Sequence, residues 1–124
     1  MKTVKVIIAG SREFNNYDLL AEKCDYILSR LLNNPQCEVI IVSGTARGAD
    51  QLGERYARDR NLNIERFPAD WSLHGKSAGY IRNKQMAEAA DALIAFRKAG
   101  AGNRGTDHMI RLAKEHGLLV RIIN

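Results

Sequence analysis

The sequence has few cysteines and no long apolar run. Two cysteines occur in 124 residues, Cys24 and Cys37. Their spacing matches neither a metal motif nor a disulfide framework, so we expect small buried thiols in a reducing, cytoplasmic setting. No apolar run approaches the roughly 20 residues that cross a bilayer. The chain begins directly on a strand pattern, so we expect neither a membrane span nor a signal peptide.

Metal-binding patterns and long runs of charge are also missing. His74, His108 and His116 lack metal-ligand spacing and a paired nucleophile, so we expect surface or packing histidines and no metal or cofactor. The net charge is +5. It favours anionic partners, but lysine and arginine form no polybasic tail. Arginines instead follow strand-like segments, as Arg12 and Arg47 do, which favours discrete phosphate contacts.

Five short apolar segments have the pattern of strands buried on both faces. They are residues 4–9, 39–42, 64–67, 92–96 and 119–123. Helical periodicity fills most of the intervals, and the first helix is capped by Asn15 or Asn16. Gly53 is expected to let the second helix lie close to the sheet. Residues 72–78 are expected to be irregular.

The alternation of strands and helices predicts one α/β domain over residues 1–124. Because crossovers between parallel strands are right-handed, we predict a Rossmann-like, doubly wound, five-stranded parallel sheet of order 3-2-1-4-5. Helices should cover both of its faces. Ligands of such sheets bind beyond the carboxyl ends of the strands, where the winding reverses. Here that point lies between the first and fourth strands.

A glycine-rich loop at residues 100–106 follows the fourth strand and precedes a helix. It matches G-x-G-x-x-G, in which glycines and a helix N-terminus receive a phosphate. The dinucleotide fingerprint follows the first strand and has an acidic residue about 20 positions later, which has no counterpart here. We therefore predict a phosphate site of Gly102, Arg104, Gly105 and Thr106 but no standard NAD-dependent oxidoreductase. The alternative is a mobile glycine-rich turn.

Two further loops follow the first and second predicted strands, at the same end of the sheet as the glycine-rich loop. Gly10, Ser11 and Arg12 end the first strand, and Arg12 is either an anion contact or an exposed arginine. Residues 43–50 offer a second set of backbone donors at a helix start, with Arg47 able to pair with a phosphate. Asp50 would repel a phosphate, so we expect it to bind a ribose hydroxyl or to cap the helix.

Catalytic candidates are few. Gly75-Lys76-Ser77 resembles the end of a P-loop, but Asp70 stands where the required earlier glycine would be, so no Walker-type ATPase follows. Trp71 could stack on a base or fill the core. No nucleophile has an adjacent base, and the weak candidates for catalysis are Arg82, Asp70 and Asp107.

With these residues in view, the chain resembles the SLOG superfamily, and within it the YspA-like proteins of the YpsA-related branch. The resemblance covers essentially the whole length and is carried by residues 10–14, 43–50, 68–71, 78–79, 82–83, 86, 90–91 and 105–106. It implies a Rossmann-like fold whose loops bind nucleotides or nucleotide-derived ligands in a sensor or processing role. It also implies self-association.

The superfamily also contains Lonely Guy-type phosphoribohydrolases, which release a base from a nucleoside monophosphate. Arg82 and Met86 match an arginine motif of those enzymes, and Gly105-Thr106 is similar to the end of their glycine signature. Their glutamate, however, would fall on Met109. This departure counts against hydrolysis, because base release usually needs a positioned acid or anion. A DNA-processing member that binds single strands keeps nucleic acid as another alternative.

The sequence therefore predicts a protein that binds a nucleotide or a nucleotide-derived ligand of ADP-ribose or nucleoside-phosphate type. A phosphoribohydrolase-like enzyme and a single-stranded nucleic-acid binder are the alternatives. The predicted ligand-binding residues are Gly10, Ser11, Arg12, Ser43, Gly44, Thr45, Arg47, Gly48, Asp50, Asp70, Trp71, Arg82, Asn83, Gly102, Arg104, Gly105 and Thr106.

Overall fold

A computed structural model describes residues 1–100 and 102–124, so Ala101 of the predicted glycine loop lies outside the described residues. The strands are β1 (Lys2–Gly10), β2 (Cys37–Ser43), β3 (Asn63–Arg66), β4 (Ala92–Phe96) and β5 (Leu119–Ile123). The helices are α1 (Tyr17–Leu32), α2 (Ala49–Asp59), α3 (Trp71–His74), α4 (Ala78–Ala89) and α5 (Arg104–Glu115), with a 3₁₀ turn at Gly75–Ser77.

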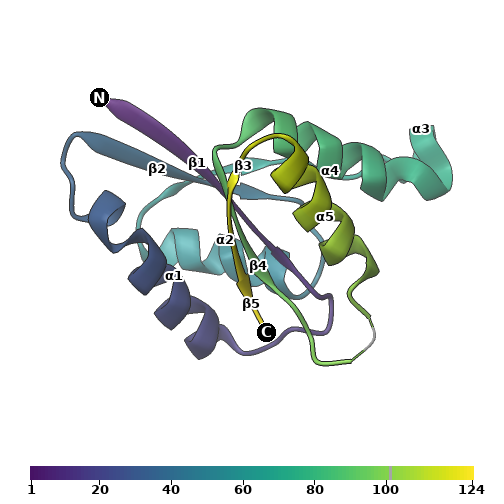
Figure 1. The fold of residues 1–124 in the computed structure, drawn as a ribbon, viewed down its shortest axis with the longest axis horizontal. Helices are drawn as coiled ribbons and strands as arrows, with labels where there is room; N and C mark the ends of the chain where they lie inside the picture. Colours follow the sequence, from purple (N-terminus) through teal and green to yellow (C-terminus); the bar gives the residue numbers. More distant parts are fainter. Residues whose placement is uncertain (101) are drawn as a thin grey trace.

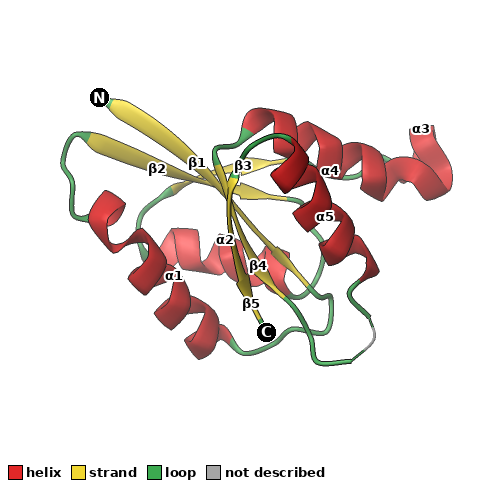
Figure 2. Cartoon of the chain, viewed as in Figure 1, coloured by secondary structure: helices red, strands yellow, loops and turns green. Residues whose placement is uncertain are grey.

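The five strands form one sheet in the order β3-β2-β1-β4-β5 (Figures 1 and 2). Every pair of neighbours is parallel. The predicted Rossmann-like α/β fold and its strand order are therefore confirmed. The winding reverses beside β1, which pairs with β2 on one side and with β4 on the other.

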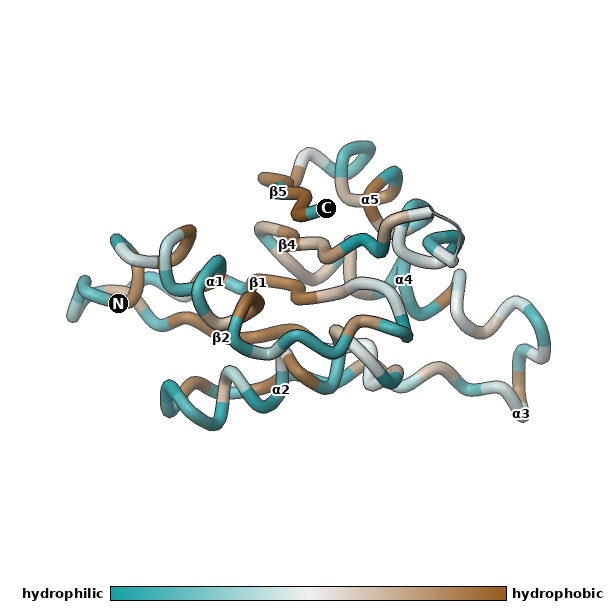
Figure 3. Tube along the Cα trace, turned by 90° about the horizontal axis from the view of Figure 1, so that it is seen from below, coloured by the Kyte–Doolittle hydropathy of each residue, from teal (hydrophilic) through white to brown (hydrophobic). Residues whose placement is uncertain are grey.

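Helices α1 and α2 lie on one side of the sheet and α4 and α5 on the other (Figure 1), and much of the apolar character follows the strands (Figure 3). Successive residues of β1 point to opposite faces. Val6 and Ile8 pack in the cluster of α1 and α2. Ile7 and Ala9 pack in the cluster of α4 and α5. The central strand is thus apolar on both faces, as its continuous apolar run predicts.

The edges of the sheet are less buried than the sequence pattern indicates. β3 and β5 contain no fully buried residue, because each has a neighbouring strand on one side only. Residues 72–78, predicted to be irregular, instead complete α3, form a 3₁₀ turn and begin α4. Asp70 begins α3 by accepting a hydrogen bond from the backbone N–H of Leu73 at 3.0 Å.

Across the described parts of the chain, no helix combines the length and apolar character of a membrane span. The same residues contain no group of three or more histidine, cysteine or acidic side chains arranged to hold a metal ion. Cys24 is buried and Cys37 partly buried, and both thiols are free.

Helix α2 lies directly on the sheet at Gly53. A Cβ atom at this position would lie 2.8 Å from both Cβ and Cγ2 of Ile8, which is fully buried in β1. The predicted close approach of this helix to the sheet is therefore present. Because the interior is packed at the density of organic crystals, neither partner has room to move.

We predict that Gly53→Ala destabilises the fold by about 1–3 kcal/mol, the usual range for overpacking a core. Gly105→Ala is the matched control, because a Cβ there meets nothing within 4 Å. In the first turn of α5 that alanine should be neutral or stabilising by about 0.5–1 kcal/mol. Urea unfolding of both variants measures the difference, and equal free energies of unfolding would contradict the packing argument.

Candidate functional site

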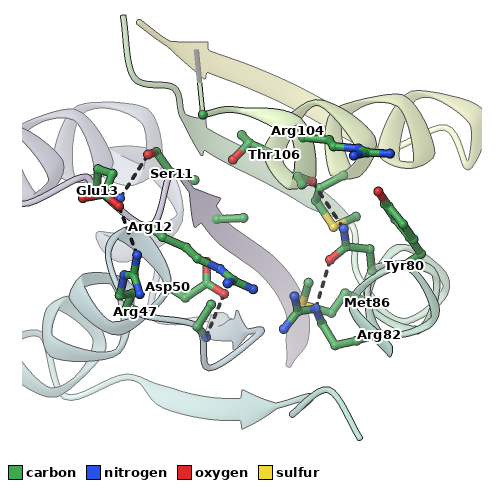
Figure 4. Close-up of a pocket in the computed structure, with 18 of the residues that line it drawn as sticks. Ser11, Arg12, Glu13, Arg47, Asp50, Tyr80, Arg82, Met86, Arg104 and Thr106 are labelled. Atoms are coloured by element: carbon green, nitrogen blue, oxygen red, sulfur yellow. Dashed lines mark hydrogen bonds and ion pairs between the residues drawn. The ribbon is translucent and has the colours of Figure 1, made fainter. Parts of the chain in front are cut away.

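A cavity of about 370 Å³ opens at the carboxyl ends of β1 and β4 (Figure 4). It therefore lies at the point where the winding of the sheet reverses. Four stretches of chain contribute to its lining, namely the end of β1 with the loop after it, the loop that leads into α2 with the first turn of that helix, residues between Trp71 and Met86, and the start of α5 with the loop before it. Segments far apart in the sequence meet here because parallel strands end at the same edge.

Buried Ser11 holds the loop after β1 in place. Its backbone N–H donates to the carbonyl of Phe96 at 3.0 Å, and its own carbonyl accepts from Ala49 at 3.3 Å. Gly48 lies so close that a Cβ on it would stand 2.3 Å from the Ser11 carbonyl oxygen, and its φ is +82°. These contacts leave Arg12 on the rim, where its exposed side chain reaches toward the cavity (Figure 4).

Two oppositely charged side chains, Arg82 and Asp50, both lie close to Gly44 on the floor of the cavity. A Cβ on Gly44 would lie 2.8 Å from both Arg82 Nη1 and Asp50 Oδ2, and Nη1 donates to the Gly44 carbonyl. Burial raises the pKa of Asp50 to about 6, although the charge of Arg82 and the backbone N–H of Ala46 oppose the shift. Burial, and then the charge of Arg12, lowers the pKa of Arg82, which Asp50 partly restores.

The side-chain amide of Asn83 joins this pair to α5. Its Oδ1 accepts from Arg82 Nε at 3.0 Å. Its Nδ2 lies 3.3 Å from the Gly105 carbonyl oxygen and 3.1 Å from His108 Nδ1. Because Arg82 can only donate, the oxygen of Asn83 faces it, and the amide hydrogens face Gly105 and His108. The amide thus ties the floor of the cavity to the first turn of α5.

The glycine loop before α5 is held by a residue outside the predicted site. Asn103 accepts from the Lys98 N–H at 2.8 Å and donates to the Lys98 carbonyl at 2.7 Å. Gly100 and Gly102 have φ values of +83° and +96°, which suit glycine. Since Asn103 bonds backward, no side chain among the described residues caps α5. Its first N–H groups are thus left for another acceptor.

Two aromatic residues border the cavity. Trp71 is 52% exposed, so it does not fill the core. Its Cη2 lies 3.7 Å from the position of a Cβ on Gly79. Tyr80 is 40% exposed and meets the ring of His108 edge-on, with centroids 4.5 Å apart. The cavity therefore has exposed aromatic rings at its rim and a cationic group on its floor.

The structure gathers most, but not all, of the predicted site residues. Those that line the cavity are Gly10, Ser11, Arg12, Arg47, Asp50, Trp71, Arg82, Asn83, Gly102, Arg104, Gly105 and Thr106. Gly44 and Thr45 line an adjoining hollow of about 300 Å³. Ser43, Gly48, Asp70 and Asp107 line neither space.

Residues outside the cavity have other partners. The Ser43 hydroxyl donates to Glu54 at 2.7 Å and accepts from the Thr45 N–H at 3.0 Å. Several donors of the predicted second cradle are therefore used within the protein. Asp70 caps α3, and Asp107 binds Arg97 through both carboxylate oxygens at 2.8 and 3.2 Å. The two weak catalytic carboxylates thus line neither the central cavity nor the hollow beside Gly44.

Lys76 and Tyr80 line the cavity although the sequence reasoning did not select them. They stand at helical spacing before Asn83, so extending the period of α4 backward would have found them. Lys76 falls in the segment predicted to be irregular, which hid this signal, whereas Tyr80 lies in the predicted helix but was not among the predicted site residues. Met109, where the phosphoribohydrolase glutamate would fall, is buried and lines the cavity. The position contributes an apolar surface.

The ionisation of Asp50 should make stability depend on pH. Its pKa rises from 3.8 to about 6 on folding. Between these values the native state binds more protons than the unfolded state, so stability falls as pH rises. Relative to Asp50→Asn, we expect the wild type to lose about 2 kcal/mol of unfolding free energy between pH 4 and pH 7. Urea unfolding at several pH values measures this, with Asp18→Asn as a surface control. A difference independent of pH would contradict it.

The sequence profile of the YspA, cpYpsA-related SLOG family matches residues 4–74. Over 126 aligned residues the chain is 35% identical to the Gene 61 protein of Mycobacterium phage D29. The alignment covers 94% of this chain and 93% of that protein. The matched segment includes most of β1, the loop into α2 and Trp71. The chain belongs to the YspA, cpYpsA-related SLOG family.

Proposed function

We propose that this protein binds a nucleotide-derived ligand in the central cavity, with a phosphate at the start of α5. One observation carries the proposal: a helix N-terminus without a side-chain cap opens on a cavity that Arg12 and Arg82 also line. Unsatisfied N–H groups and the helix dipole both favour an anion there. Membership of the SLOG family supports a nucleotide-related role in binding or processing.

The charges that line the cavity support an anionic ligand. Its five cationic side chains face two carboxylates, Glu13 and Asp50; the cations are Arg12, Arg47, Lys76, Arg82 and Arg104. Glu13 is paired with Arg47 at 3.0 Å. Asp50 lies beside Arg82 and has a raised pKa. The charge of Arg12 also lowers the pKa of Arg82, and a phosphate between the two would relieve this repulsion.

The size and aromatic lining of the cavity support a nucleotide over a bare anion. Its volume of about 370 Å³ falls in the range of small-ligand sites, roughly 300–1,000 Å³. Trp71 and Tyr80 offer exposed rings on which a base can stack. The ligand is of ADP-ribose or nucleoside-phosphate type, and the protein acts as a sensor or processing module. Self-association is part of the proposal.

Loss of a charge at the rim should weaken binding. We expect Arg12→Gln to reduce the affinity for ADP-ribose or AMP about 10- to 100-fold, because hydrogen bonds to charged groups contribute about 1.5–3 kcal/mol. Arg58→Gln is the matched control, since Arg58 is exposed in the last turn of α2 and outside the cavity lining. Isothermal titration calorimetry measures both. Failure of the wild type to bind any nucleotide of such a panel would refute the proposal.

Hydrolysis of the ligand is a second candidate function, favoured by Asp50 alone. This carboxyl lines the cavity, and its pKa of about 6 would let it exchange a proton near neutral pH. Against it stands the apolar Met109 where a catalytic glutamate would be. We expect AMP and NAD to remain intact after long incubation at high protein concentration, as followed by chromatography. Release of free base that Asp50→Asn abolishes would establish hydrolysis instead.

A further inference from the structure

A further hollow, which we call the outer hollow, has a volume of about 600 Å³ and lies along α5. It is lined by Tyr80, Arg104, Asp107, His108 and Arg111. Tyr80 and Arg104 line both this hollow and the central cavity, so the two spaces adjoin at these side chains. A molecule bound at the start of α5 therefore has the outer hollow next to it.

The outer hollow is positively charged. Arg104 and Arg111 are seven residues apart, so they lie on one face of α5 and are separated by about 10 Å along its axis. The carboxylate of Asp107 is held by Arg97 through two bonds, so its charge is largely compensated. Among the described residues, the ion pair of Arg111 is a long and exposed one, 3.8 Å from Glu115. Such surface pairs contribute little, so this guanidinium is available to another anion.

The neutral ring of His108 supplies a third donor. Arg82 fixes the orientation of the Asn83 amide, whose Nδ2 then donates to His108 Nδ1. With Nδ1 as the acceptor, the ring proton resides on Nε2. Burial, together with the charge of Arg111, lowers the pKa of His108, while Glu115 opposes the shift. The ring therefore stays neutral at neutral pH and can donate from Nε2.

We propose that this outer hollow is a second anion subsite for the same ligand. The ligand would then carry two phosphate-bearing nucleotide units, with the first phosphate at the start of α5 and the second near Arg111. The unit between them would lie over Tyr80. This inference rests on the proposed function, and it narrows the ligand from a mononucleotide to the dinucleotide class.

The test compares AMP with a 5′-phosphorylated diadenylate by calorimetry on the wild type, Arg111→Gln and the control Arg58→Gln. We expect the dinucleotide to bind the wild type about tenfold more tightly than AMP does. Arg111→Gln should weaken the dinucleotide by about tenfold, as for the loss of one charge-assisted hydrogen bond, and leave AMP within about twofold. Arg58→Gln should change neither affinity. Since Arg111 is exposed, thermal unfolding should show an unchanged fold.

Each contrary result identifies what has failed. Equal wild-type affinities for AMP and the dinucleotide, or equal losses for both in Arg111→Gln, would overturn the outer subsite and leave the central pocket intact. No binding of either would overturn both proposals. A hexanucleotide distinguishes a strand from a dinucleotide. An affinity that keeps rising with length and falls steeply with salt would replace the dinucleotide assignment with single-stranded nucleic acid.

Discussion

The buried guanidinium of Arg82 joins the two halves of this fold. From α4 it reaches the carbonyl of Gly44 after β2 and lies near Asp50 of α2. Through Asn83 it is also connected to the first turn of α5. Burying such a charge costs several kcal/mol unless its hydrogen bonds are satisfied. The loops on both sides of the winding reversal are therefore held together by Arg82, whose buried charge needs the hydrogen-bond partners on both sides.

The same arrangement gives the cavity its chemical character. Arg82 and Asp50 form the floor, while the exposed Arg12 stands above them at the end of β1. Asn103 bonds back to the glycine loop rather than capping α5, so the helix start keeps its unsatisfied donors. A side-chain cap on α5 and an uncharged cavity floor would each make the folded chain more stable. Proteins retain such unfavourable features mainly where a ligand uses them.

Much of the fold and part of the site could be predicted from local patterns. The strand at Ala92–Phe96 is a continuous apolar run, and the strand at Leu119–Ile123 is apolar except for Arg121. Right-handed crossovers leave few possible strand orders. Arg12 and Thr106 were selected because they follow strands that end at the reversal. The short α3 was missed because four residues are too few for helical periodicity. Lys76 reaches the cavity from the 3₁₀ turn after α3, and Tyr80 from the first turn of α4.

The sequence alone determined the alternation of elements, the parallel sheet and the three loops at one end of it, because these follow from periodicity and chain connectivity. Only the tertiary structure decided which polar side chains face the cavity. Asp70 and Asp107 lie near it in sequence order, yet a helix cap and an ion pair with Arg97 remove them. Asp50 and Arg82 are 32 residues apart and both lie close to Gly44. Proximity of this kind depends on how helices on opposite faces of the sheet pack, which no local pattern encodes.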